Sequence, residues 1–458
     1  MVRNATADTP SLSDKVYVGL FCVLICCLPL SYQPLIHLGE QSGANIDISL
    51  IYLVMAALAL MSLPRLWRQR RELIRAKYNI LLLAFAGWNL LAIIWSDNPL
   101  RGTLVAGLVC LGTAVFLSIQ TRKTVLLAHR KALFTCLSAT TIVLCLFSLW
   151  QLFGDALGVP NSLTLLPSTY QSQVFGYARA TGFAAEPQFL GSFLLIPLTI
   201  FLYRALMRGN VASYLLFGMV TAALTLTISR GAILGMVVVF VLTATLAFTQ
   251  TSLRRLAVAA GVALISIAAG IGLLVTAAHI NTSDRVSGHD ALVKTVSQLS
   301  LGTIDISKPS RETTPVPSAT PAPKSHAPGY VQESTNSRLS MTQEALGLLS
   351  DSPIRTLYGI GTGSFGATLH DKYNTQSVTS IVNNHYIEVL TELGIIGIGL
   401  FVGFFGLIYR TLIAQRQWLF IPALSALLVQ WLFFSGYPNV LHLWPLLGLV
   451  LILPPLKR

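Results

Sequence analysis

The sequence predicts an all-α polytopic membrane protein with about twelve transmembrane helices and one large outer loop between spans nine and ten. The first of three observations is composition. Of the 458 residues, 53% are hydrophobic and only 11% are charged, and the mean hydropathy is +0.67. A typical soluble domain has about 25% charged residues. So apolar a chain cannot cover a water-facing surface, and its composition argues against a soluble enzyme.

The second observation is the recurrence of apolar runs of about twenty residues, long enough to cross a bilayer core of roughly 30 Å as helices. The predicted spans cover approximately residues 16–36, 46–64, 78–96, 102–120, 132–153, 187–203, 211–228, 231–249, 256–278, 386–408, 418–435 and 439–456. They divide the chain into a region of nine spans (1–278), a large outer loop (279–385) and a region of three spans (386–458). A shorter outer segment covers about 154–186.

The third observation is the distribution of charge. The formal net charge is +13. With the N-terminus inside, the inner segments hold 20 of the 31 Lys and Arg residues but only three of the 18 Asp and Glu residues, a net charge of +17. The remaining 11 basic and 15 acidic residues sum to −4. Because inner loops are rich in Lys and Arg, we expect both termini inside. The net charge therefore reflects topology and does not indicate nucleic acid binding.

The large outer loop has three parts of different character. Its middle, 309–328, is rich in Pro, Ser and Thr and predicts an extended or disordered stretch. Residues 337–349 have the apolar spacing of a short amphipathic helix, and Ser340 with Gln343 resembles a capping box at its start. The glycine-rich stretch Gly359–Gly366 is more typical of a simple loop than of a phosphate-binding loop, because no strand, helix and lysine accompany it.

Three arginines stand out because they lie on the predicted outer side, where the positive-inside rule does not account for them. Arg179 lies just before the sixth span, and Arg230 lies in a tight turn between two long apolar runs. Arg338 opens the predicted loop helix. An arginine at a membrane boundary is costly unless it meets an anion or lines a water-filled cavity. Glu186, seven residues after Arg179, is a candidate partner; the alternatives are snorkelling to lipid headgroups and simple solvation.

The strongest group of candidate residues precedes and enters the tenth span. His385, Glu388 and Glu392 have the i, i+3, i+7 spacing of one helix face. Two carboxylates entering a membrane predict a polar cavity or pairing with basic residues. A histidine there can accept a proton or bind a phosphate. The alternatives are that the glutamates only fix helix packing, or that the three residues bind a metal. No further ligand cluster accompanies them, so we expect no metal.

The outer face is therefore predicted to hold an arginine-lined pocket with one histidine and a few carboxylates. The guanidinium fork suits phosphate oxygens, so a substrate with a lipid tail and a diphosphate head fits this chemistry. The six cysteines all lie inside predicted spans, which indicates packing and not a disulfide framework.

At these residues the chain resembles the bacterial O-antigen ligase and Wzy-type polysaccharide polymerase superfamily. The resemblance covers most of the chain, through the order of spans and the late outer loop. The motifs that carry it are Arg179-Ala-Thr-Gly, Glu186-Pro187, Ser229-Arg230-Gly231, Arg338, Gly359-Ile-Gly-Thr-Gly-Ser-Phe365, Asn384-His385 and Glu392-Leu-Gly-Ile-Ile-Gly397.

The resemblance implies a GT-C-like, metal-independent glycosyltransferase of the bacterial inner membrane with its active site on the periplasmic face. It implies a donor glycan carried on undecaprenyl diphosphate, with no other cofactor. The acceptor is either the next glycan repeat unit, in a polymerase, or lipid A–core, in a ligase. The implied partners are these substrates, the bilayer and a chain-length regulator.

The resemblance also implies roles for individual residues. His385 would orient or deprotonate the attacking sugar hydroxyl, with Glu186 or Glu388 as the alternative base, and Asn384 and Glu392 would support the site. The residues implied to bind the donor diphosphate are Arg179, Arg230 and Arg338.

Two departures from the family pattern affect the choice of reaction. Tyr386 stands where the family often has Asn after the histidine, and Glu186 stands where many members have Asn before the proline. Glu186-Pro187 is more similar to exopolysaccharide polymerases and favours polymerisation over ligation. The alternative class is a transporter or flippase for an anionic lipid-linked substrate. It predicts matching halves and basic residues at span centres, which the sequence lacks.

Overall fold

The computed structural model describes residues 11–30, 34–41, 44–172, 177–280, 330–373, 381–435 and 440–452. Within these residues, nine helical segments are long and apolar enough to cross a membrane, and three apolar helices are shorter. Each of the twelve overlaps one of the predicted spans, and α2 runs furthest past its span, to Arg75 against a predicted end at 64. The protein is a helical, multi-pass membrane protein, as the sequence predicted.

The nine long segments are α1 with η1 (Leu12–Cys27, Leu28–Leu30), α2 (Leu50–Arg75), α3 with η2 (Lys77–Leu91, Ala92–Trp95), α4 (Pro99–Thr121), α6 (Arg130–Ala156), α9 (Pro187–Arg208), α11 (Arg230–Ala247), α12 (Leu253–Ile280) and α17 (His385–Ala414). The three shorter helices are α10 (Val211–Thr227), α18 (Phe420–Gln430) and α19 (Leu443–Ile452). The remaining elements are α5 (Lys123–Ala128), α7 (Asn161–Thr164), η3 (Ser168–Tyr170), α14 (Tyr330–Ser350), α15 (Pro353–Tyr358), α16 (Phe365–Tyr373) and the strands β1 (Pro34–Gln41) and β2 (Ala44–Ser49).

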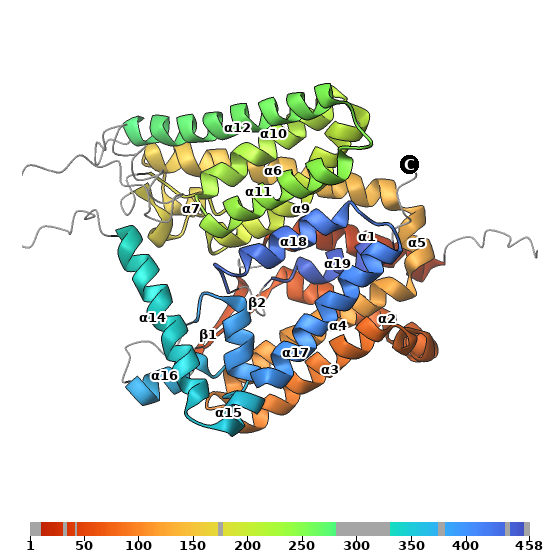
Figure 1. Ribbon diagram of the computed structural model, residues 1–458, viewed down its shortest axis with the longest axis vertical. Helices are drawn as coiled ribbons and strands as arrows, with labels where there is room; N and C mark the ends of the chain where they lie inside the picture. The colour runs from red at the N-terminus through yellow and green to blue at the C-terminus, as the bar shows by residue number, and fades with distance from the viewer. Residues whose placement is uncertain are drawn as a thin grey trace, which may run out of the picture.

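The helices pack in two groups, visible in Figure 1. In one, α9 packs against α10 and α11, and α10 packs against α12. In the other, α17 packs against α3, and α4 packs against α2 and α19. The short helix α18 packs against α11 and α9, and the segment that follows it contacts the start of α17. The two groups therefore meet at the end of α18, and they also meet where α1, which packs against α2, packs against α6.

One short antiparallel hairpin was not predicted. β1 pairs with β2, with Pro34 opposite Ser49 and Gln41 opposite Ala44. The first predicted span, 16–36, therefore extends too far, because the helix and its 3-10 turn end at Leu30. Pro34 has no amide hydrogen to continue a helix, and such a residue is tolerated at the start of a strand. The second span begins only at Leu50, after the hairpin.

A buried charge network ties α1, α2 and α4 together at one end of the molecule. Arg122, only 1% exposed, donates to Asp14 Oδ1 at 2.7 Å, and its guanidinium lies 4.3 Å from the centre of the Tyr17 ring. Arg65 pairs with the same carboxylate oxygen at 2.7 Å. Breaking a buried pair leaves an uncompensated charge, so this network is expected to hold the three helices in register. The three charged residues, Asp14, Arg65 and Arg122, belong to segments predicted to be inner.

The large outer loop is described from Tyr330 onward. The helix α14 contains the predicted 337–349 segment but begins earlier, at Tyr330. Ser340 is inside the helix, where its hydroxyl donates to Glu344 at 2.9 Å, so the predicted capping box is wrong. The proline-rich stretch 309–328 lies outside the described residues.

Candidate active site

The segment 177–186 carries Arg179 and Glu186. It is held by hydrogen bonds to Gln151, a fully buried residue of α6. Gln151 Oε1 accepts hydrogen bonds from the amides of Thr181 at 3.0 Å and Gly182 at 2.8 Å. Its Nε2 donates to the carbonyl of Gly182 at 2.8 Å. Gly182 has a φ of +61°, a conformation that favours glycine. The segment is thus held by side-chain bonds and not by regular secondary structure.

Arg179 connects this segment to the turn between α10 and α11. Its Nε donates to the carbonyl of Thr227 at 3.2 Å, and its Nη2 donates to the carbonyl of Ile228 at 3.1 Å. The last carbonyls of a helix have no partner within that helix, so an arginine satisfies them well. Ile228 itself is left-handed, with a φ of +47°, and this sharp turn lets α11 begin at Arg230. The structure therefore brings Arg179 beside the turn that carries Arg230.

Glu186 lies between two of the predicted arginines. It is the N-cap residue of α9, and its carboxylate accepts a hydrogen bond from the Gln188 side chain. Burial raises the pKa of Glu186, while the Gln188 hydrogen bond and the guanidinium groups of Arg338 and Arg179 oppose that rise. Arg338 also donates from Nη1 to the carbonyl of Phe433 at 2.9 Å, just beyond α18.

The start of α17 is tied to the same stretch after α18. Asn384 caps α17 by accepting from the amides of Tyr386 at 3.1 Å and Ile387 at 3.2 Å, and its Nδ2 donates to the carbonyl of Leu432 at 3.2 Å. The amide of His385 donates to the carbonyl of Trp431 at 3.0 Å. The His385 ring is 3% exposed and packs against Trp431, with 4.6 Å between the ring centres.

Glu388 and Glu392 are both buried but belong to a different neighbourhood. Glu392 accepts hydrogen bonds from the amides of Gly363 at 2.8 Å and Phe365 at 3.3 Å. Arg101, in the first turn of α4, is the cation that acts electrostatically on both carboxylates. The i, i+3, i+7 spacing thus places these glutamates against the glycine-rich stretch, and the hypothesis that they only fix packing describes Glu392 well.

The glycine-rich stretch is itself a packed junction. The hydroxyl of Ser96 donates to the carbonyl of Thr362 at 3.0 Å, and the amide of Gly361 donates to the carbonyl of Glu392 at 3.0 Å. A Cβ on Gly361 would lie 2.5 Å from Ser96 Cα. The amides of this stretch therefore bind protein groups, which agrees with the prediction of a simple loop and not a phosphate cradle.

Residues 214–402 match a family model described as O-antigen ligase. Over these residues the chain is similar to the O-antigen ligase family. No curated protein matches the chain. The family supports a ligase- or polymerase-type enzyme activity.

The matched residues contain only part of the candidate site. Arg230, Arg338 and His385 fall inside the matched residues, together with both glutamates of α17. Arg179 and Glu186 lie before the match, and the segment after α18 lies beyond it. The structure nevertheless brings Glu186 close to Arg179 and Arg338. The site therefore combines the matched residues with flanking segments.

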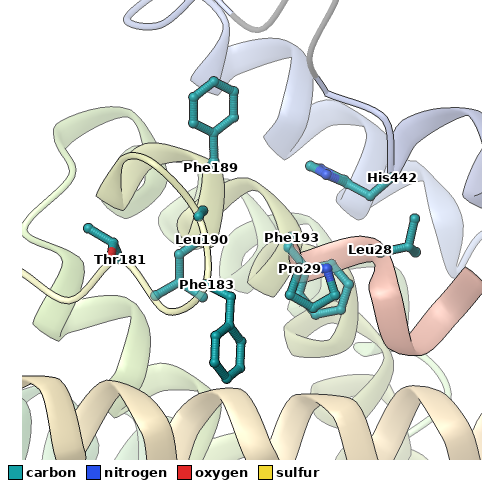
Figure 2. Close-up of a pocket in the computed structure, with 9 residues that line it drawn as sticks. Leu28, Pro29, Thr181, Phe183, Phe189, Leu190, Phe193 and His442 are labelled. Carbon is teal, nitrogen blue, oxygen red and sulfur yellow. The ribbon is translucent and has the colours of Figure 1, made fainter. Parts of the chain in front are cut away.

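A small pocket lies next to this site, between η1, the segment 181–184, the start of α9 and His442 (Figure 2). Figure 2 shows His442 and Thr181 approaching it from opposite sides, with Phe183, Phe189 and Phe193 between them. His442 Nε2 lies 3.0 Å from the hydroxyl of Ser192. The lining is mainly apolar and aromatic. Among the described residues, no group of three or more His, Cys, Asp or Glu side chains is placed to hold a metal ion.

Sequence reasoning missed three residues that organise the outer face: Gln151, Arg101 and Gln430, the last residue of α18, whose Nε2 donates to the carbonyl of Gln188 at 2.8 Å. Arg101 could have been found by the same argument as the other outer arginines, because it immediately precedes a span on the outer side. Gln151 and Gln430 lie inside apolar runs. A single glutamine in a span does not indicate which residue it will bond to. Their importance depends on contacts with distant segments.

Proposed function

We propose that this protein is an inner-membrane glycosyltransferase that transfers a glycan from undecaprenyl diphosphate to a sugar acceptor on the periplasmic face. The observation that carries the proposal is the convergence of Arg179, Arg338 and Glu186 beside the turn of Arg230 in a chain similar to the O-antigen ligase family. These residues come from segments that are far apart in sequence. Their shared location favours an anionic ligand over independent snorkelling of each arginine.

In the proposed reaction the acceptor hydroxyl attacks the anomeric carbon of the donor glycan. A new carbon–oxygen glycosidic bond forms, and the bond between the anomeric carbon and the diphosphate oxygen breaks. The electron pair of that bond leaves with the lipid diphosphate, whose growing negative charge the three arginines stabilise. The hydroxyl proton passes to a carboxylate base.

Glu186 is the base that the geometry favours. Its carboxylate lies under the influence of Arg179 and Arg338, where the diphosphate would bind, and a base must reach the reacting hydroxyl. The His385 ring instead packs among aromatic side chains, and Glu388 shares its surroundings with Glu392 and Arg101. On this proposal, Asn384 and His385 anchor the start of α17 to the segment after α18.

The test is a deletion strain complemented with variants of the gene. Removing a positioned group that stabilises developing charge lowers rates by about 10²–10³. We expect Arg230→Ala and Arg179→Ala to abolish the surface glycan on a gel. The matched control is Arg254→Ala, an exposed arginine at the start of α12 in a segment predicted to be inner. Normal glycan from both outer variants, at normal protein levels, would overturn the proposal.

The same gel separates the two acceptors. If the protein is a polymerase, which Glu186-Pro187 favours, the deletion strain keeps single repeat units on its acceptor and loses the ladder of longer chains. If it is a ligase, as the description of the family model suggests, the deletion strain loses all glycan from lipid A–core.

A further inference from the structure

Gln430, the last residue of α18, lies where two helices of the candidate site begin. Its Nε2 donates to the carbonyl of Gln188, in the first turn of α9, at 2.8 Å. A Cβ placed on Gly231, in the first turn of α11, would lie 3.1 Å from both its Cγ and its carbonyl oxygen. The residue is fully buried. Gln430 therefore touches both the helix that follows Glu186 and the helix that begins at Arg230.

Small residues make this junction tight. A Cβ on Gly191 would lie 2.4 Å from Ala232 Cβ, so α9 and α11 approach each other as closely as their backbones allow. The same Cβ would lie 3.8 Å from Gln430 Nε2. Close helix contact through small residues, with a polar side chain bonding across it, is a usual way to fix helices in a membrane.

A purely structural role would not require glutamine here. Within the described part of the chain, the buried Oε1 of Gln430 has no hydrogen-bond partner, and an unpaired buried oxygen is unfavourable. Leucine has a similar volume and would remove that oxygen. The one contact that leucine cannot make is the bond to the carbonyl of Gln188.

That contact leads directly to the proposed base. Gln188, held by Gln430, donates its own side-chain hydrogen bond to Glu186. The segment that follows Gln430 also contacts the site. The carbonyls of Trp431 and Leu432 accept hydrogen bonds from the start of α17, and that of Phe433 accepts one from α14. Gln430 and the carbonyls that follow it lie beyond the matched residues 214–402, whereas their partners Arg338, Asn384 and His385 lie inside them.

We propose that Gln430 is a positioning residue for the transfer, holding Gln188 and thereby Glu186 in place relative to Arg230. This inference rests on the proposed function. Misplacing a reacting group by about 1 Å costs up to about a hundredfold in rate. Loss of this single anchor is therefore expected to lower turnover by about tenfold without unfolding the protein.

The experiment compares Gln430→Leu with wild type in membranes from the deletion strain, with the accumulated lipid-linked donor of those membranes as the probe. Folded protein is measured as the monodisperse fraction in detergent and by its melting midpoint. Turnover is measured across pH 5–9. The matched control is Thr243→Val, which also removes a buried side-chain oxygen without a described partner, on α11 about 20 Å from Gly231.

We expect Gln430→Leu to keep wild-type folded protein and lose about tenfold in turnover, while Thr243→Val keeps both. A second readout is specific to the mechanism. The Gln188 bond lowers the pKa of Glu186, alongside the charges of Arg338 and Arg179. Loosening Gln188 should therefore move the acidic limb of the pH profile to higher pH, a shift that a general loss of packing does not produce.

Two outcomes would overturn the inference: unchanged turnover and pH profile, or a loss of turnover matched by an equal loss of folded protein. The Arg230→Ala variant, run in parallel, separates this failure from failure of the proposed function. If Arg230→Ala is inactive and Gln430→Leu is normal, only the role of Gln430 is refuted. If both are fully active, the proposed function fails as well.

Discussion

Gly394 provides the sharpest test of how the outer loop docks on the membrane helices. It lies inside α17 but is not helical, with a φ of +66° and a ψ of −169°. That region of backbone space is essentially open only to glycine. A Cβ there would lie 2.2 Å from the carbonyl oxygen of Leu357 and 2.6 Å from the amide nitrogen of Gly359. The perturbation is therefore Gly394→Ala.

The expected cost has two sources. Holding an alanine in this conformation costs about 1–3 kcal/mol. Because the clashing atoms belong to backbone, α15 and the glycine-rich stretch must also move away. That movement strains the bonds from Gly363 and Phe365 to the Glu392 carboxylate, and hydrogen bonds to charged groups contribute about 1.5–3 kcal/mol each. A total loss of about 4 kcal/mol follows if one of these bonds is broken.

The assay is the melting midpoint of the detergent-purified protein at a fixed scan rate. A loss of 4 kcal/mol corresponds to about 8 °C or more, at roughly 2–4 °C per kcal/mol. The control is Gly399→Ala in the same helix, where an added Cβ meets nothing within 4 Å. Alanine there should be neutral or stabilise by about 0.4–1 kcal/mol. Equal midpoints for the two variants would refute the described junction between α17 and the glycine-rich stretch.

Two further predictions concern charge. The Arg338→Gln variant loses a guanidinium that lowers the pKa of Glu186, so that pKa should rise. Because a base must be ionised, the acidic limb of the turnover profile should then move to higher pH. An unmoved limb would count against Glu186 as the base. At the opposite end, Asp14→Asn leaves Arg122 buried without its carboxylate and should cost about 3–5 kcal/mol of stability, seen as a lower melting midpoint. The control is Asp351→Asn, which removes exposed ion pairs with Arg355 and Lys372 and should cost less than about 1 kcal/mol. Similar losses of stability from the two variants would contradict the buried network.

The spans were predictable because each depends on its own composition. A run such as 256–278 is apolar whatever surrounds it, and the structure has a helix there, Leu253–Ile280. The hairpin was not predictable in the same way. Residues 34–36 continue an apolar run, and only pairing with a second strand distinguishes them from the end of a helix. The start of α14 was also misplaced, because a capping-box pattern occurs inside helices as well as at their ends.

The candidate site was predictable where a residue was locally anomalous. Arg230 was identified because its turn is tight and its flanks are apolar, and the structure places it at the first residue of α11. The spacing of Glu388 and Glu392 predicted one shared helix face, and the structure has both side chains buried. Spacing could not show that Arg101 and the glycine-rich stretch would meet them, because those partners are distant in sequence. Gln430 was missed for the same reason.

Formal charge distinguishes the two polar centres of the outer face. Around Glu392, two carboxylates share Arg101, so these three side chains sum to −1, and the amides of the glycine-rich stretch provide further donors to Glu392. That centre has no positive charge left over for a further anion. Around Glu186, the two guanidinium groups that act on its carboxylate, those of Arg338 and Arg179, sum with it to +1. A positive sum suits an anionic diphosphate. The arginine centre is therefore the one that an anionic substrate would complete, whereas the glutamate centre is complete within the protein.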